Sequence, residues 1–384
     1  YWSGMADEAS PVEPGAHFYR ALLIDAHGHP IDKRNAWASR AVVYVRLIPP
    51  GAADTVRFRL DVPADAGDTI TLTARLNYRK FSWYNTHFAF AGVPDPQQED
   101  AAVTPDFDDR RFVFTGDTAM VSGQIKDVPT LPIVVVAQDE QVLQVVDPAA
   151  ALPDLAAAAE QPATDRERWN DYGIGLFLAG DLRAAQHAFE QVTRLEPAYV
   201  DGWVNLGRVA LAEGDLDEAR AVLERALERE PQLARTHFFL GLLEKEMGDY
   251  ARALEHLRVS SEQYPRDRVV ANQIGRVHFL ERRYADAVAA LQQVLAVDPE
   301  DLMAHYTLML SYRGLGDLER SEHHRQLYER FKADEASQIL TGEYRQRNPH
   351  DNNERQPIHE HATAPLEALP PVAIPAATTA AGAQ

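Results

Sequence analysis

The sequence WVNLG at Trp203–Gly207 decides the fold of this 384-residue chain, because its pattern returns three more times at one fixed distance. The related stretches are WNDYG at Trp169–Gly173, HFFLG at His237–Gly241 and ANQIG at Ala271–Gly275. Four prolines keep the same step of 34 residues: Pro197, Pro231, Pro265 and Pro299. Since proline cannot continue a helix, each one marks where a unit closes. The period predicts a repeated unit of two antiparallel helices.

Fixed places within the unit have separate roles. The glycine of each quoted stretch lets the partner helix approach closely, and small residues stand at the helix crossing: Ala185, Ala219, Ala253 and Ala287. Larger side chains are expected to fill the interior: Phe189, Leu223, Leu257 and Leu291. A Gly–Asp pair ends the first helix and caps the second, at Gly180, Gly214, Gly248 and Gly316. The fourth repeat has Arg282–Arg283 instead.

This pattern is identified as that of tetratricopeptide repeats, a family whose helix pairs stack into an α-solenoid. We predict such a solenoid over residues 166–347, with four full repeats and a degenerate capping repeat. The capping repeat starts near His305 and has Met309, Ser321 and Ala333 where the others have glycine, alanine and proline. Because solenoids of this family usually hold other proteins, the resemblance implies a protein-binding role.

Strand patterns precede the repeats. Apolar and polar residues alternate in Thr55–Val62 and Thr69–Tyr78, and the turn-forming residues between them predict a hairpin. With further short strands, residues 37–147 are predicted to form an antiparallel β-sandwich of immunoglobulin-like type. Residues 1–36 are expected to be an extended arm, residues 148–165 an Ala/Pro-rich linker, and residues 348–384 a low-complexity tail. The fold class is therefore multidomain, a β-sandwich followed by an α-solenoid.

Composition excludes several classes of function. The net charge of −20 argues against nucleic-acid binding, which needs clustered Lys and Arg. Without cysteine the chain has no disulfide, thiolate zinc site, Cys nucleophile or covalently attached haem. The chain shows no nucleophile elbow, phosphate-binding Gly-rich loop or paired catalytic carboxylates, so we predict no enzyme activity and no cofactor. Since Tyr1 is not Met, we interpret the chain as processed or truncated, which is compatible with export.

Side chains on the first helices of the repeats are the candidate protein-binding site: Asn170, Arg208, Phe238, Arg276, Phe279 and Tyr306. They form a mostly apolar set that suits an extended or helical protein segment. Chaperone-binding members clamp a terminal carboxylate with Lys and Asn residues, but the matching positions here hold Asn170 and Ile174, Val204 and Arg208, and Phe238 and Leu242, so that basic clamp is not formed. The alternative is that several of the six residues simply pack between neighbouring helices.

Histidines are the candidate ligands for a metal or for haem iron. His17, His27 and His29 lie near one another in the N-terminal arm, and His350, His359 and His361 precede the tail. Neither group has the spacing of a familiar metal site, such as the helical His-Glu-x-x-His motif. We therefore interpret them as ordinary loop histidines, with metal binding as the alternative.

Two other stretches allow a functional and a structural interpretation. Asp106–Asp109 resembles part of a calcium loop but lacks the spacing and glycine of an EF-hand, so an acidic surface loop is favoured. Tyr78–Phe90 contains six aromatic residues. This cluster forms either the core of the sheet or an exposed surface for sugars, in which case Trp83 is expected to bind carbohydrate.

Much of the chain also resembles the C-terminal part of exported bacterial proteins that join multihaem cytochrome modules to tetratricopeptide repeats. The stretches that carry this resemblance are Pro14–Tyr19, Asn35–Gly51, Asn77–Phe81, Tyr264–Arg268, Phe331–Ala336 and Asp351–His361. The resemblance implies export to the periplasm, the cell surface or the outside. It implies no redox function for this chain, which has no cysteine to hold haem.

These observations favour an exported structural protein that self-assembles into a filament or surface layer. A solenoid, a second domain and arms at both ends offer interaction modules without catalytic chemistry. The residues Pro371, Val372, Ile374 and Pro375 of the tail could add to a sheet edge or lie along the solenoid of a neighbouring copy. One alternative is a periplasmic scaffold that docks a multihaem cytochrome, and another is a carbohydrate-binding sandwich on a solenoid.

Overall fold

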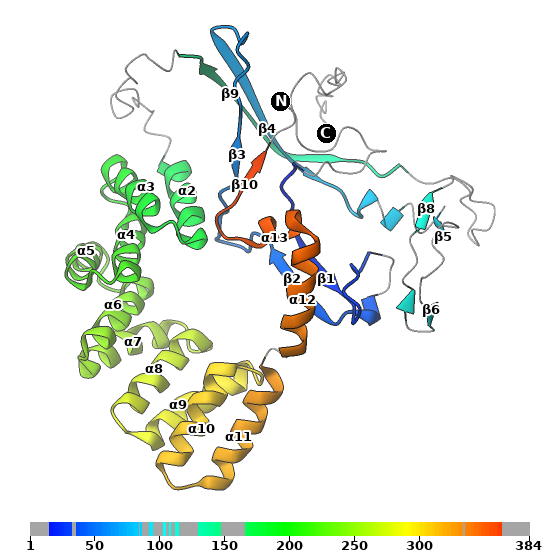
Figure 1. The fold of residues 1–384 in the computed structure, drawn as a ribbon. Helices are drawn as coiled ribbons and strands as arrows, with labels where there is room; N and C mark the ends of the chain where they lie inside the picture. The colour runs from blue at the N-terminus through cyan, green and yellow to red at the C-terminus, as the bar shows by residue number, and fades with distance from the viewer. Residues whose placement is uncertain are drawn as a thin grey trace, which may run out of the picture. The chain divides into compact units, whose positions relative to one another are not determined.

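The computed structural model describes residues 15–32, 36–83, 85–86, 92–94, 103–104, 107–108, 112–114, 130–146, 166–332 and 335–362 (Figure 1). The chain divides into two compact units. The first unit contains residues 1–47, 56–159 and 335–384, and the second contains residues 48–55 and 160–334. The solenoid is thus inserted into a unit that is built from both ends of the chain.

The second unit consists of five helix pairs. Their first helices are α2 (Arg166–Ala179), α4 (Val200–Glu213), α6 (Ala234–Met247), α8 (Arg268–Leu280) and α10 (Leu302–Gly314). Their second helices are α3 (Leu182–Leu195), α5 (Leu216–Arg229), α7 (Tyr250–Gln263), α9 (Tyr284–Val297) and α11 (Leu318–Phe331). Each first helix packs against its own second helix, and α4, α6, α8 and α10 also pack against the second helix of the preceding repeat (Figure 1). The predicted helix pairs are confirmed.

A glycine sets the distance between the two helices of a repeat. A Cβ atom built at Gly207 would lie 2.6 Å from Leu223 Cγ, and one at Gly241 would lie 2.7 Å from Leu257 Cγ. Such distances are too short for two carbon atoms, and the leucines are fully buried. Since well-packed cores yield little, a larger residue at these places would separate the helices.

The turns within the repeats follow the predicted chemistry, with one exception. Gly214 and Gly248 end their helices at φ +83°, in the left-handed region, and the Asp215 carboxylate accepts a hydrogen bond from Glu218 N at 3.1 Å. In the fourth repeat Arg282 takes the left-handed place at φ 60°. Arg283 stands at the cap position there and makes no side-chain cap hydrogen bond. This turn therefore carries strain that glycine and aspartate relieve in the other repeats.

Replacing Arg282 by glycine should stabilise the solenoid by about 1 kcal/mol, because a left-handed non-glycine residue costs roughly that much. The same replacement at Arg258, which is exposed within α7, should instead destabilise by about 1 kcal/mol through the poor helix propensity of glycine. Urea unfolding followed by helical circular dichroism measures both changes. If both variants changed the free energy of unfolding in the same direction, the assignment of strain to Arg282 would be contradicted.

The closing prolines accept hydrogen bonds from the next helix pair. Trp203 Nε1 donates to the carbonyl of Pro197 at 2.9 Å, and His237 Nε2 donates to that of Pro231 at 2.9 Å. In the fifth repeat His305 Nε2 makes the same 2.9 Å contact with Pro299. An aromatic ring with an N–H group thus joins successive repeats at the place where the backbone turns.

The two histidines in this series each meet a second histidine. His237 Nδ1 lies 2.9 Å from His256 Nδ1, and His305 Nδ1 lies 2.9 Å from His324 Nδ1. Since His305 Nε2 carries the proton donated to the carbonyl, its Nδ1 accepts from His324 in the neutral pair. Burial and the neighbouring His305 and His323 lower the pKa of His324 to about 4. His324 is therefore expected to stay neutral in the folded chain well below pH 6.5.

We predict that this histidine pair makes the solenoid acid-sensitive. His324 takes up a proton near its ordinary pKa of 6.5 when unfolded but only near about 4 when folded. Its contribution to stability is therefore complete above pH 6.5 and is lost progressively as the pH falls toward 4. The free energy of unfolding should fall less between pH 7.5 and pH 4.5 in His324→Phe than in the wild type. His323→Phe removes only the smallest of the effects that lower the pKa of His324 and should change the slope less than His324→Phe does; an unchanged slope in His324→Phe would contradict the prediction.

The fifth repeat departs from the pattern as expected of a cap. Ser321 replaces the crossing alanine and is buried, and its hydroxyl donates to the carbonyl of Met309 at 2.9 Å. The chain then leaves the solenoid earlier than predicted. The next helix, α12 (Glu335–Arg347), packs on a strand of the first unit, so residues 335–347 extend that unit and do not continue the repeats.

Residues 48–55 are an unexpected part of the second unit. They lie against α2 at Gly175, where a Cβ atom would approach Thr55 Oγ1 to 2.5 Å and the Asp54 carbonyl carbon to 2.9 Å. Glycine is needed at this place because backbone, and not only a flexible side chain, occupies the space. The segment had been assigned from sequence to the strand region.

The core of the first unit joins the two ends of the chain. Strands β1 (Arg20–Ile24) and β2 (Ala41–Arg46) are antiparallel, and a short helical turn, η1 (Ala36–Ala38), precedes β2. Helices α12 and α13 (Pro349–Arg355) pack on β2. The shared buried cluster consists of Leu22, Ile24, Ala41, Val43, Tyr44 and Tyr344. Residues 20–24, predicted to belong to an extended arm, are therefore part of this core.

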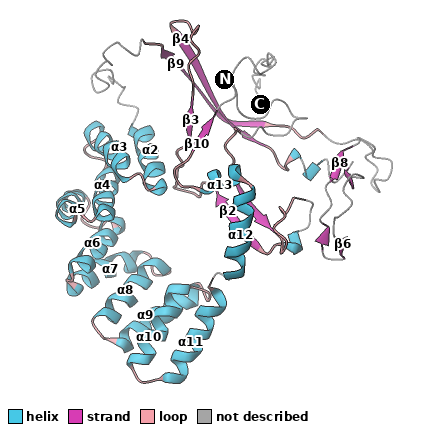
Figure 2. Ribbon diagram, in the orientation of Figure 1, coloured by secondary structure: helices cyan, strands magenta, loops and turns pink. Residues whose placement is uncertain are grey.

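The remaining strands do not pair as predicted. β3 (Arg57–Arg59) runs parallel to β10 (Glu360–Ala362), and β4 (Thr69–Tyr78) runs antiparallel to β9 (Val134–Gln144), as Figure 2 shows. The predicted hairpin between the two alternating stretches is thus wrong, because each finds a partner far along the chain. Short pairs form between β5 (Gly92–Pro94) and β8 (Phe112–Phe114), and between β6 (Val103–Thr104) and β7 (Phe107–Asp108).

Among the described residues the strands form two-stranded pairs and not the predicted β-sandwich. Their strands form five separate two-stranded sheets, and β9 is exposed along its whole length. An immunoglobulin-like sandwich would need three or more strands in each of two sheets, with one face of each buried. The described helices include none that is long and apolar enough to cross a membrane.

Candidate functional site

The first helices of the repeats form the inner face of the solenoid. Neighbouring first helices touch one another, α2 with α4, α4 with α6, α6 with α8 and α8 with α10. The six predicted binding residues all lie on these helices. The structure gives them different environments, and their binding role stays a prediction.

Asn170 is not available to a ligand, because it links the first two repeats. It is buried, and its Oδ1 accepts a hydrogen bond from Asn205 Nδ2 at 3.1 Å. Arg235 continues the link into the third repeat by donating to Asn205 Oδ1 at 3.4 Å and to Asp201 Oδ1 at 2.7 Å. In the first three repeats the inner face is therefore occupied by contacts between the repeats themselves.

Arg208 is half-buried in the same region. Its guanidinium lies 4.2 Å from the ring centre of Phe177 and 5.6 Å from that of Phe239. Burial, with a smaller effect of Arg235, lowers the pKa of Arg208. Phe238 is also half-buried and packs on the cluster around Leu257. For these residues the alternative of packing within the solenoid describes what the structure shows.

The inner face changes character in the last two repeats. Exposed apolar side chains follow α8 and α10 at helical spacing: Val269, Leu280, Met303 and Tyr306. Arg276 and Arg313 lie on the same faces and are exposed. Neither arginine forms an ion pair with another of the described residues. Phe279 is half-buried, with its ring centre 5.9 Å from that of Tyr284. We call this set the α8–α10 face.

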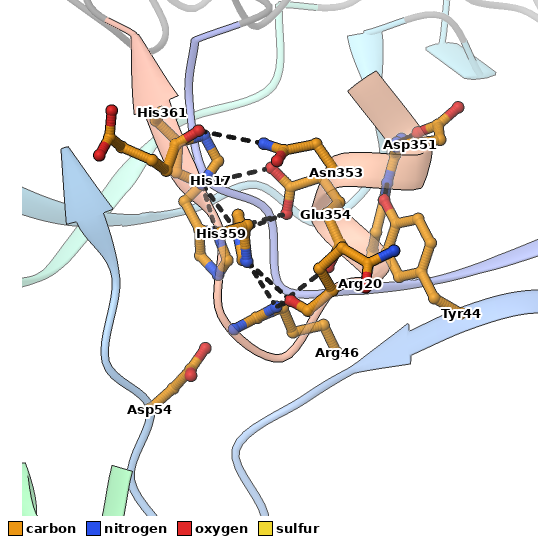
Figure 3. Close-up of polar contacts among 12 residues, drawn as sticks. His17, Arg20, Tyr44, Arg46, Asp54, Asp351, Asn353, Glu354, His359 and His361 are labelled. Atoms are coloured by element: carbon orange, nitrogen blue, oxygen red, sulfur yellow. Dashed lines mark hydrogen bonds and ion pairs between the residues drawn. The ribbon is translucent and has the colours of Figure 1, made fainter. Parts of the chain in front are cut away.

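The histidines predicted as candidate ligands fall in two separate places. His27 and His29 lie in the turn after β1, where their backbone N–H groups donate to Asp25 Oδ1 at 2.8 and 2.9 Å. His17 lies elsewhere, beside Glu354, His359 and His361 (Figure 3). His350 is exposed at the start of α13 and is not part of this group.

The four side chains of this group converge on one point. Their ligand atoms all lie within 4.8 Å of one another, and the side chains of His17, Glu354, His359 and His361 are 5%, 8%, 1% and 3% exposed. Burial raises the pKa of Glu354, while nearby His17 and Arg46 act in the opposite direction. Burial, with smaller effects of His17 and His359, lowers the pKa of His361 to about 4. We call this group the His–Glu cluster.

Sequence analysis named three members of the His–Glu cluster and missed Glu354. The signal was the order of residues from Glu354 to His361, with a glutamate in the last turn of a helix followed by His-x-His at the start of a strand. Alternate strand residues point to one side. The contribution of His17 had no local signal, since it lies 344 residues before His361.

The other predicted sites are only partly described. Tyr78 and Phe81 are 56% and 48% exposed, and Trp83 is half-buried, whereas Tyr84, Phe88 and Phe90 lie outside the described residues. Of the acidic stretch, Asp108 belongs to β7 and its neighbours at 106 and 109 lie outside. The tail residues 371–375 also lie outside the described residues.

Comparison with known families places repeats where the sequence pattern predicted them. A tetratricopeptide-repeat profile matches residues 176–238 and 210–274, and a second matches residues 272–331. The chain contains tetratricopeptide repeats. Repeats of this fold are protein-interaction scaffolds, which implies protein partners.

Similarity to individual proteins is more limited. A BBSome complex member BBS4 homolog from Drosophila melanogaster is 29% identical over 79 residues, which are 21% of this chain and 16% of that protein. A crystal structure of MamA is 18% identical with a TM-score of 0.38, over 42% of this chain and 94% of that one. MamA from Desulfovibrio magneticus RS-1 is 17% identical with a TM-score of 0.40, over 44% and 98%. The predicted resemblance to multihaem cytochrome proteins stays a prediction.

Proposed function

We propose that this chain is a non-enzymatic scaffold that binds a segment of a protein partner on the α8–α10 face. The observation that carries the proposal is the combination of exposed apolar side chains on α8 and α10 with two exposed arginines on the same helices. In the first three repeats the inner polar groups pair with each other, as Asn205 does with Asn170. In the last two repeats Leu280, Met303 and Tyr306 are exposed together.

The chemistry of the α8–α10 face defines the segment that it suits. Apolar side chains of the partner would cover Leu280, Met303 and Tyr306, and removal of that surface from water favours binding. Acidic side chains would meet Arg276 and Arg313, which stand exposed on a chain of net charge −20. Arginine and tyrosine are the residue types most enriched among energetically dominant interface positions.

We propose the tail of a second copy as the occupant. Residues 363–375 combine Leu366, Leu369, Val372 and Ile374 with the acid Glu367 and with prolines that favour an extended segment. A tail bound on a neighbour's solenoid is a head-to-tail contact, and such a contact produces an open filament unless its rotation closes a ring. A multihaem cytochrome docked on the same face is the alternative partner.

We also propose that the protein is exported. Export is supported by the resemblance to exported cytochrome–repeat proteins, and the cysteine-free composition is compatible with it. An exported self-assembling scaffold would act as a filament or as part of a surface layer.

A labelled peptide of residues 363–384 should bind to the chain truncated after Ala362, as measured by fluorescence anisotropy. Arg276→Glu and Arg313→Glu should each weaken binding by about 10-fold or more, because each replaces an attraction to Glu367 by a repulsion. Arg258→Glu makes the same charge change on the exposed side of α7 and should leave the affinity unchanged. Equal losses in all three variants would contradict a site on the α8–α10 face.

Assembly should depend on the tail. Sedimentation and negative-stain electron microscopy of the full chain should show polymers, and deletion of residues 363–384 should leave discrete particles, because the occupant of the face is gone. Polymers that persist without the tail would contradict self-assembly through it. Peptide binding that fails while a purified multihaem cytochrome binds the α8–α10 face would favour the alternative partner.

A further inference from the structure

The His–Glu cluster has the dimensions of a metal site. His17 Nδ1 lies 3.1 Å from His361 Nε2 and 3.3 Å from Glu354 Oε2. His359 Nε2 lies 3.0 Å from His361 Nε2, and Glu354 Oε1 lies 3.5 Å from His361 Nε2. Zinc bonds of 2.0–2.1 Å separate tetrahedral ligand atoms by about 3.3–3.4 Å. His359 Nε2 lies 3.8 Å from Glu354 Oε2. Most of these distances are therefore close to the spacing that a tetrahedral zinc ion requires, and none between the four ligand atoms exceeds 4.8 Å.

Pairwise hydrogen bonds and a central cation would hold this group in different ways. His359 Nδ1 lies 2.8 Å from the Gln356 carbonyl oxygen and 3.2 Å from Arg46 Nη1; in the tautomer that donates to the nearer carbonyl, Nε2 of the neutral ring presents a lone pair. His361 Nε2 faces both that lone pair and His17 Nδ1, at 3.0 and 3.1 Å. A single proton on His361 Nε2 can be directed at one of these neighbours and not at both. A cation at the centre receives all three lone pairs at once.

The surroundings hold the ligands as metal sites usually do. The carbonyl of Gln356 fixes the His359 ring by accepting its Nδ1 proton, which is the common second contact of a zinc-bound histidine. Arg46 Nη1 donates to the carbonyls of Glu354 and Gln356 at 3.0 and 3.2 Å. Asn353 Nδ2 donates to the Glu360 carbonyl at 3.1 Å (Figure 3). These contacts fix the bend between α13 and β10 that carries three of the four ligands.

The charges and the geometry narrow the kind of ion. Three neutral imidazoles and one carboxylate carry a charge of −1, so a divalent cation compensates the buried Glu354 side chain, whose desolvation is costly when unpaired. Nitrogen and carboxylate ligands without thiolates suit zinc. A haem iron would instead need its two axial ligands on opposite sides of a porphyrin, whereas these nitrogens converge within about a hydrogen-bond length of each other.

We propose that His17, Glu354, His359 and His361 form a structural zinc site. All four positions of the tetrahedron come from the protein, which is typical of structural and not of catalytic zinc. The ion would fasten the segment before β1 to the bend before β10, and so join the beginning of the described chain to its end. This inference is independent of the partner proposed for the solenoid.

The test uses the untagged full chain. After removal of metal with a chelator, competition titration against a chromogenic zinc indicator and elemental analysis should show about one tightly bound zinc per chain. His361→Ala and Glu354→Gln should each lose more than about 100-fold in zinc affinity, since even changes outside the ligand set cost 10–100-fold. Cobalt bound in place of zinc should give the intense visible absorption of a four-coordinate site.

Matched controls separate binding from folding. His27→Ala and His29→Ala remove histidines of the neighbouring turn and should retain full zinc affinity. Arg46→Gln keeps all four ligands and should weaken binding by about 10- to 100-fold through the loosened bend. Helical circular dichroism should be unchanged in every variant, because the solenoid forms a separate unit.

The following outcomes would each overturn the proposal of a structural zinc site. A wild-type chain that binds no zinc at micromolar concentration would do so, as would equal losses in the His27→Ala and His361→Ala variants. Copper bound tightly by a chain that binds no zinc when zinc is offered alone would show a metal site of another kind and would contradict the assignment to zinc. Cobalt spectra of an octahedral complex would contradict a site closed by four protein ligands.

Discussion

The close contact between a glycine on one helix and a large apolar side chain on its partner sets the spacing of every full repeat. Gly207 meets Leu223, Gly241 meets Leu257, Gly275 meets Leu291 and Gly173 meets Phe189, each at a distance that leaves no room for a Cβ atom. Because the helices of a pair are this close, the first helices of successive repeats also touch. The inner face, with its polar links and its exposed apolar half, depends on that spacing.

The repeats could be predicted from the sequence because their determinants are local and recur. Glycine, alanine and proline mark the same three places in four consecutive units, and each acts through backbone geometry that is the same in any surroundings. The capping unit was recognised by the loss of these residues. Ser321 shows the physical consequence, since a buried hydroxyl at the alanine place needs an acceptor and finds the Met309 carbonyl.

The first unit could not be predicted in the same way, because its partners are set by long-range pairing. β4 has the alternation of a half-buried strand, yet it pairs with β9 and not with its neighbour in sequence. Cross-strand contacts that fix this register, such as Arg75 Nε to Gln138 Oε1 at 2.9 Å, have no local signature. β3 similarly pairs with β10, near the end of the described chain. Alternation indicated which segments are strands and gave no information about their partners.

The surroundings of the predicted site residues could not be read from the sequence, for two different physical reasons. On the inner face the helical positions were correct, but a position does not show whether its side chain is already engaged; Asn170 is hydrogen-bonded to Asn205, whereas Tyr306 is exposed. In the His–Glu cluster the His-x-His pair places two imidazoles on one side of a strand, which is a local signal. The other two ligands come from α13 and from the segment before β1, and only folding brings them to that strand.

The insertion of the solenoid into the first unit explains why the ends of the chain need a strong mutual attachment. Joining segments separated by a long loop costs conformational entropy, although each doubling of the loop adds only about 0.6 kcal/mol. The buried cluster around Ile24 and Tyr344 offsets part of that cost. A polar network also stabilises this attachment. Arg20 Nη2 donates to Asp351 Oδ1 at 2.8 Å, and the Tyr344 hydroxyl donates to Asp351 Oδ2 at 2.6 Å. Burial and the adjacent Asp351 raise the pKa of Tyr344, so its hydroxyl remains a donor. Apolar burial and charge-assisted hydrogen bonds thus hold the same two segments together, the β1–β2 pair and the α12–α13 helices. The proposed zinc site lies beside them and would add a third connection between the two segments.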